Sequence, residues 1–207
     1  MMELIPVWFY LITSVIYLTS SVIGFLTSYF ALKASKISKN KSFLILSLSF
    51  LIISLGLLVL FGISVYIYTT LELYKGSGIS LNLLNHYGFS TYYILSLVGY
   101  LLLVFMYLPK INKLFVLYVP IWYASLDKFH IISFVLIMYV IIRSLINSFR
   151  KKNLDSYLVT FAFISLAMFH LLLLLMSFSQ SMYIIANLLL IAGFLSLLYM
   201  LVRVNRK

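Results

Sequence analysis

The stretch SFLILSLSFLIISLGLLVLF, residues 42–61, is the clearest indication of how this chain folds. Its residues carry no charge, and about 20 apolar residues in a helix are enough to cross the hydrocarbon core of a bilayer. Strands of a membrane β-barrel would instead alternate polar and apolar residues over about ten positions. The stretch does not alternate, so it predicts a membrane-spanning helix.

The rest of the chain has the same character. Of its 207 residues, 64% are hydrophobic and 9% are charged, whereas a soluble domain has about 25% charged residues. We therefore expect an all-α, multi-pass transmembrane bundle that forms a single domain over residues 1–207. Seven stretches are long and apolar enough to qualify as spans, or nearly so: about 4–32, 43–69, 92–108, 110–126, 129–149, 156–178 and 182–203.

Basic residues predict the orientation, because cytoplasmic loops are enriched in lysine and arginine. With seven spans, all but two of the 15 basic residues fall on one side of the membrane, and the exceptions are Lys75 and Lys128. We expect that side to be the cytoplasm. The protein would then lie in the cell membrane with its N-terminus outside and its C-terminus inside. An even number of spans would break the pattern.

The span directions permit an internal repeat. The first three and last three spans run in the same directions, with the fourth as a connector, which gives a 3+1+3 parallel arrangement known from some transporters. The best internal match sets Ser42–Phe61 against Ser156–Leu175, both of which begin with serine, an aromatic residue, leucine and an aliphatic residue. Beyond that the match is mostly shared leucine, so leucine bias remains the alternative interpretation.

Small residues mark one face of the first span. Ser20, Gly24 and Ser28 are each four residues apart, which places them on one side of a helix and allows a second helix to approach closely. Packing inside the bundle is the preferred interpretation, and a contact between copies of the chain is the alternative.

One connection is long. Residues 70–91 read TLELYKGSGISLNLLNHYGFST, and we expect an outer loop whose first half is a turn or flexible link. The second half is predicted to lie along the membrane surface.

Several chemistries are excluded by what the sequence lacks. There is no cysteine, and no aspartate or glutamate lies in the middle of a span, where proton relays place such groups. The last span has no lysine for a retinal Schiff base. No nucleotide-binding loop or hydrolytic motif is present. We therefore expect no enzyme activity, no cofactor and no metal, and any energy from nucleotide must come from a partner.

Polar residues within the spans are few. His170 and Asn187 are predicted at similar depths in the outer half, where they would share a pocket that a break at Pro120 in the fourth span helps to open. Hydrogen bonding between helices is the plainer alternative. His130 begins the fifth span and is predicted to lie about 10 Å from His170 in depth, which disfavours joint ligation of a haem.

The predicted cytoplasmic face is strongly basic. A polyanion or anionic lipid headgroups would find partners there, although the orientation rule alone also accounts for the charge. The candidate contacts are Lys33, Lys36, Lys39, Lys41, Arg143, Arg150, Lys151 and Lys152.

These observations favour passage or scaffolding without chemistry: a channel, a translocation component or a core subunit of a membrane complex. In size, span number, absence of cysteine and lysine-rich loops such as KASKISKNK (residues 33–41), the chain resembles the polytopic membrane component of the archaeal (Ced-type) DNA-import system. The resemblance implies a DNA-conducting pore that works with other membrane subunits and a separate ATPase. The alternatives are a haem-binding electron-transfer subunit that uses His130 and His170, and a sensor whose outer pocket binds a small ligand.

Overall fold

The computed structural model describes residues 7–73, 81–108, 126–175 and 180–206, and all regular structure in these ranges is α-helical. The described ranges contain six helices, and all six are long and apolar enough to cross a membrane. The chain is therefore a multi-pass membrane protein. Their bounds are α1 (Val7–Ser38), α2 (Lys41–Leu73), α3 (Leu81–Tyr107), α4 (Leu126–Lys151), α5 (Leu154–Leu174) and α6 (Gln180–Val204).

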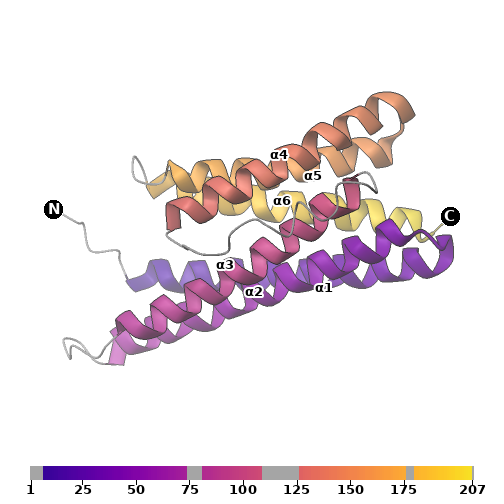
Figure 1. Ribbon diagram of the computed structural model, residues 1–207. Coiled ribbons are helices and arrows are strands. Elements are labelled where there is room, and N and C mark those ends of the chain that lie inside the picture. Colours follow the sequence, from indigo (N-terminus) through magenta and orange to yellow (C-terminus); the bar gives the residue numbers. More distant parts are fainter. Residues whose placement is uncertain (1–6, 74–80, 109–125, 176–179, 207) are drawn as a thin grey trace.

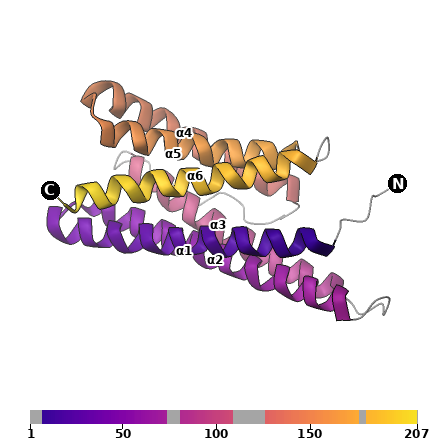
Figure 2. The ribbon, with the colours of Figure 1, turned by 180° about the vertical axis from the view of Figure 1, so that it is seen from behind.

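The six helices form a closed ring. Each helix packs against its neighbours in sequence, and α6 packs against α1. The chain runs back and forth between the two ends of the bundle, except that α3 and α4 run in the same direction (Figures 1 and 2). We call α1–α3 the first half and α4–α6 the second half. Both halves therefore have the same sequence of helix directions.

Basic residues gather at one end of the ring, which we call the basic end. The α1–α2 turn, the α4–α5 turn and the end of α6 all lie there (Figure 1). The described basic residues toward this end are Lys33, Lys36, Lys39, Lys41, Arg143, Arg150, Lys151, Lys152, Arg203 and Arg206.

The helix ends differ from the prediction. The first span was expected to end at residue 32, but α1 continues to Ser38, so Lys33 and Lys36 lie on the helix and not in a loop. A hydropathy pattern stops at the first charges. The helix itself continues because lysine stems run along apolar surface while the ammonium group stays in the polar region.

The long outer loop is shorter than predicted. α2 extends to Leu73 and α3 already begins at Leu81, so the two ends of the expected loop 70–91 are helical. The expected surface segment is the first part of α3, continuous with the third span. Residues 74–80 lie outside the described residues.

The other predicted spans have different outcomes. The spans at 129–149, 156–178 and 182–203 correspond to α4, α5 and α6, with α5 ending at Leu174. The fourth span, 110–126, lies outside the described residues except for Leu126, where α4 begins. α3 and α4 run in the same direction (Figures 1 and 2), and the fourth span itself stays a prediction.

Large side chains fill the interior of the ring. The rings of Phe50 in α2 and Phe194 in α6 meet edge to face at 5.1 Å, and both side chains are fully buried. Gly24 lies on this contact, because a Cβ there would meet Ser54 and Phe194. The small-residue face of α1 therefore packs inside the bundle, which was the preferred interpretation. The alternative, that this face contacts another copy of the chain, is wrong.

The two turns at the basic end share an unusual backbone. Lys39 and Lys152 follow α1 and α4, respectively, and both have positive φ, 54° and 49°. The next residue in each turn is an asparagine whose side-chain oxygen accepts a hydrogen bond from the start of the following helix: Asn40 from Ser42 N and Asn153 from Ser156 N, each at 2.9 Å. Both turns therefore place an asparagine oxygen at the start of the next helix, two residues before the donor in the first turn and three residues before it in the second.

Helix packing repeats in the same way. Close to the basic end, hydroxyl groups join α1 to α2 (Ser28 and Ser47, 3.1 Å) and α4 to α5 (Ser144 and Thr160, 2.8 Å). Further along, a glycine lets the third helix of each half approach the backbone of the second. A Cβ on Gly99 would lie 3.0 Å from the Ser49 carbonyl oxygen, and one on Gly193 would lie 3.0 Å from that of Ala162.

Candidate functional site

A chain of three hydrogen-bonded side chains lies inside the ring. His130 Nδ1 in α4 is 2.9 Å from His170 Nδ1 in α5, and His170 Nε2 is 2.9 Å from the hydroxyl of Tyr100 in α3. The exposed fractions are 4% for His130, 0% for His170 and 1% for Tyr100. The network therefore connects the second half to the first half in a part of the protein that excludes both water and lipid.

Aromatic rings enclose the histidines. Phe129 stacks on Tyr93 at 4.3 Å and meets the edges of His130 and His170 at 4.9 and 5.6 Å. Phe169 borders both imidazoles from α5. This shell fixes the ring orientations and keeps the dielectric low, which strengthens the hydrogen bonds and makes a lost partner costly.

The geometry fixes how protons are shared. Only one hydrogen fits between the two Nδ1 atoms, so at least one of them carries none. Neutral imidazole has one donor and one acceptor nitrogen. With both rings neutral, either Tyr100 donates to His170, which donates to His130, or the whole chain of bonds runs in reverse. The network is thus a short path along which bond polarity can switch.

The predicted separation of the two histidines is wrong. They were expected to differ by about 10 Å in depth, but their rings are in direct contact. Helix ends explain the error: α5 ends at Leu174, close after His170, and α4 begins at Leu126, one turn before His130. Both histidines therefore lie about one turn from the same end of the bundle.

Asn187 belongs to a separate polar contact. It is 1% exposed, its Nδ2 donates to the Tyr183 carbonyl at 2.8 Å, and its Oδ1 has no hydrogen-bond partner among the described residues. The Tyr183 hydroxyl in turn lies 2.7 Å from that of Tyr17, which connects α6 to α1. His170 has both ring nitrogens engaged elsewhere, as the hydrogen-bonding interpretation expected. Pro120 lies outside the described residues, and the shared pocket stays a prediction.

A haem does not fit the histidines as they stand. Nitrogen ligands lie about 2 Å from a metal, so two opposite ligands are about 4 Å apart, whereas the two Nδ1 atoms are 2.9 Å apart and Tyr100 holds the other nitrogen of His170. Within the described ranges, no group of three or more metal-ligating side chains occurs.

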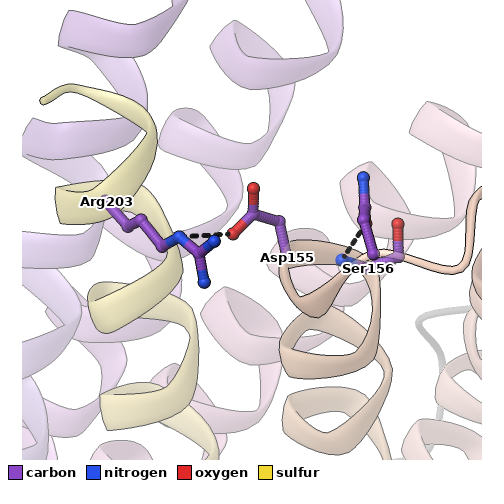
Figure 3. Close-up of polar contacts among 4 residues, drawn as sticks. Asp155, Ser156 and Arg203 are labelled. Atoms are coloured by element: carbon purple, nitrogen blue, oxygen red, sulfur yellow. Dashed lines mark hydrogen bonds and ion pairs between the residues drawn. The ribbon is translucent and has the colours of Figure 1, made fainter. Parts of the chain in front are cut away.

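Among the described residues at the basic end, Asp155 is the one acidic side chain. Asp155, near the start of α5, forms an ion pair with Arg203 of α6 at 3.5 Å, as Figure 3 shows. Arg203 was not among the predicted polyanion contacts, which are Lys33, Lys36, Lys39, Lys41, Arg143, Arg150, Lys151 and Lys152. All eight lie toward this end of the bundle, and their contact with a polyanion stays a prediction.

Sequence reasoning missed Tyr100. It is one of 17 tyrosines, and nothing in its neighbourhood along the chain distinguishes it from the tyrosines that anchor helix ends. Its partner is 70 residues away, so only the helix arrangement reveals it.

No family model, curated protein or solved structure matches this chain.

Proposed function

We propose that this protein is a translocation component of the cell membrane whose path opens between its two three-helix halves. The observation that carries the proposal is the network His130–His170–Tyr100, which crosses the interface between the halves inside the bundle. Polar side chains buried at membrane depth are costly and usually serve function. In transporters built from parallel repeats, substrate sites lie at the repeat interface.

The hydrogen bonds between the two halves are weak enough to break when the halves part. Hydrogen bonds between membrane helices contribute about 0.6 kcal/mol on average and up to about 2 kcal/mol. Breaking the hydrogen bond between Tyr100 and His170 therefore requires only a small free energy, which binding of a cargo or partner can supply. The matching turns, hydroxyl pairs and glycines support two similar rigid units, because each lies within one half.

Orientation and cargo extend the proposal. The positive-inside rule puts the basic end in the cytoplasm, which gives an N-terminus outside and a C-terminus inside with seven crossings. The resemblance to the archaeal DNA-import component makes DNA the proposed cargo and a separate ATPase the proposed motor. The basic end is compatible with a polyanion. Because Phe50, Phe194 and Tyr100 fill the interior, a strand would pass only after the halves part.

Cross-linking tests the proposal. Because the sequence has no cysteine, a thiol reagent reacts only with the cysteines that are introduced. The variant Tyr93→Cys/Phe129→Cys, joined by a short bifunctional thiol reagent, ties α3 to α4 and so locks the halves. Its matched control, Ser28→Cys/Ser47→Cys, ties α1 to α2 within one half. Both are reconstituted in liposomes with a membrane potential positive inside, which drives anions inward.

The measurement is uptake of a dye-labelled single-stranded oligonucleotide and of a small fluorescent anion. We expect uptake above that of empty liposomes, lost when the thiol pair between α3 and α4 is cross-linked and kept in the cross-linked control. Uptake of the small anion alone would reject DNA as cargo and keep translocation. Uptake no faster than in empty liposomes, or equally fast in both cross-linked proteins, would contradict translocation through the halves.

The haem and sensor alternatives have weaker support. Direct contact between the imidazoles leaves no interval for iron, so we expect the purified protein to show no haem absorption band that depends on His170. A sensor would need an output partner, which should then co-purify with the chain.

A further inference from the structure

A cleft of about 200 Å³ opens at the basic end, where helices of both halves converge. Its polar wall consists of Ser144, Asn147 and Lys151, which share one face of α4, together with Asn153, Asp155 and Ser156 at the α4–α5 turn. Apolar side chains form the opposite wall, including Phe43 of α2 and Met200 of α6. The cleft is separate from the histidine network, which lies toward the other end of the bundle.

The charges in the cleft favour an anion. Asp155, the one carboxylate in its lining, is paired with Arg203 at 3.5 Å. Lys151 contributes an ammonium group from the α4 wall. The surrounding basic end adds a positive field that concentrates anions in a recess with low-dielectric walls.

The hydrogen-bonding groups point the same way. The Asn153 side-chain oxygen accepts from Ser156 N at 2.9 Å, so the same side chain presents its amide nitrogen as a donor (Figure 3 shows this turn beside Asp155). Asn147 adds a second carboxamide and Lys151 adds an ammonium group, which carries three N–H donors. Donors together with an ammonium group are the usual partners of phosphate and carboxylate oxygens.

Size and polarity limit the ligand further. The cleft of about 200 Å³ is smaller than the roughly 300–1,000 Å³ of pockets that hold drug-sized ligands, so its ligand is small. Apolar contacts at Phe43, Val159 and Met200 would cover a few carbon atoms. We propose that the cleft binds a phosphate or carboxylate group attached to a short apolar segment, either as a soluble compound or as the head of an anionic lipid.

Titration calorimetry tests this assignment on the full chain in nanodiscs of phosphatidylcholine. Butyl phosphate is the probe, and 1-butanol is the uncharged control. We expect butyl phosphate to bind and 1-butanol not to bind. Lys151→Gln should weaken binding about tenfold or more, since it removes a charge-assisted hydrogen bond, and Lys151→Arg should retain it. Lys128→Gln removes a charge near the start of α4, at the opposite end of the bundle and outside the cleft, and should bind like the parent.

A second arm identifies the source of the anion. Native mass spectrometry of protein taken from membranes that contain phosphatidylglycerol shows whether that lipid stays bound. Retention by the parent and Lys128→Gln, but not by Lys151→Gln, assigns the cleft to a headgroup. Butyl phosphate binding without lipid retention assigns it to a soluble anion.

Equal behaviour of Lys151→Gln and Lys128→Gln in both arms would overturn the assignment, provided that both variants keep the parent's helical circular dichroism. This result is independent of translocation, because binding in the cleft does not require the two halves to move.

Discussion

The imidazole of His170 is held at both nitrogens. Tyr100 fixes one and His130 the other, at 2.9 Å each. The sequence could single out His170 and His130, because histidine within an apolar run is rare and needs a partner. It could not supply the partners, since these depend on where α4 begins, where α5 ends and how α3 packs against them.

Removing the Tyr100 hydroxyl tests the energetic role of the network. Tyr100→Phe leaves the ring in place but takes the partner from His170 Nε2, and an unsatisfied buried group costs about 1–3 kcal/mol, less where another partner is found. We expect a loss of about 1 kcal/mol in the free energy of unfolding, measured by denaturation in mixed lipid–detergent micelles. Tyr29→Phe is the control, because Tyr29 is 61% exposed, and should change stability by less than about 0.5 kcal/mol. Equal effects would deny the network a structural role.

Sharing of the proton is testable by spectroscopy. The geometry allows only one hydrogen between the two Nδ1 atoms of His130 and His170. In protein with ¹⁵N-labelled histidine, we expect solid-state NMR to show a through-space Nδ1–Nδ1 contact that disappears in His130→Phe. A spectrum in which His170 is unchanged by that substitution would show that the rings are not paired.

Among the elements, the turns at the basic end are the most clearly defined by local chemistry. Lysine is an unusual residue at positive φ, because its Cβ crowds the following carbonyl at a cost of roughly 1–2 kcal/mol. A turn after residue 32 was foreseen from the lysines. The place of the turn, at Lys39 and Asn40, was not, because hydropathy does not register where helix capping groups act.

Glycine should relieve both turns. Lys39→Gly and Lys152→Gly are each expected to raise the free energy of unfolding by about 0.5–1 kcal/mol, since part of the relieved strain is offset by the greater freedom of glycine in the unfolded chain. Lys39→Gln and Lys152→Gln remove the same charge but keep the strain, and should not stabilise. Lys36→Gly, inside α1, should instead destabilise by about 1 kcal/mol. Thermal unfolding of all five variants in one detergent decides the matter.

Glycine contacts define how the third helix of each half packs. Gly99→Ala and Gly193→Ala would each bring a methyl group against backbone of the neighbouring helix, and overpacking of this kind costs about 1–3 kcal/mol. Gly62 has nothing within 4 Å of its Cβ position, so Gly62→Ala should be neutral or slightly stabilising. If all three alanine variants unfold alike, the close approach of α3 to α2 and of α6 to α5 is not as described.

For the molecule as a whole, the sequence could predict a multi-pass helical protein because the apolar runs alone require lipid as their solvent. It could not predict the ring, since a leucine-rich helix face can pack against many other helices. Lipid also supplies no hydrophobic driving force that would select one partner. The parallel 3+1+3 repeat was only one interpretation of a weak match. The two halves share positive φ in their turns, hydroxyl pairs and glycine contacts, but the expected connector lies outside the described residues, so the 3+1+3 repeat stays a prediction.

The proposed translocation path requires that both halves run in the same direction, with the α1–α2 and α4–α5 turns in the cytoplasm. Single cysteines at Asn40, Asn153 and Tyr87, placed in the natural cysteine-free background, can be labelled with a membrane-impermeant maleimide in right-side-out and inverted vesicles. We predict labelling at positions 40 and 153 only in inverted vesicles and at 87 only in right-side-out vesicles. Labelling of positions 40 and 153 from opposite faces, or of both from the outside, would contradict this arrangement of the halves.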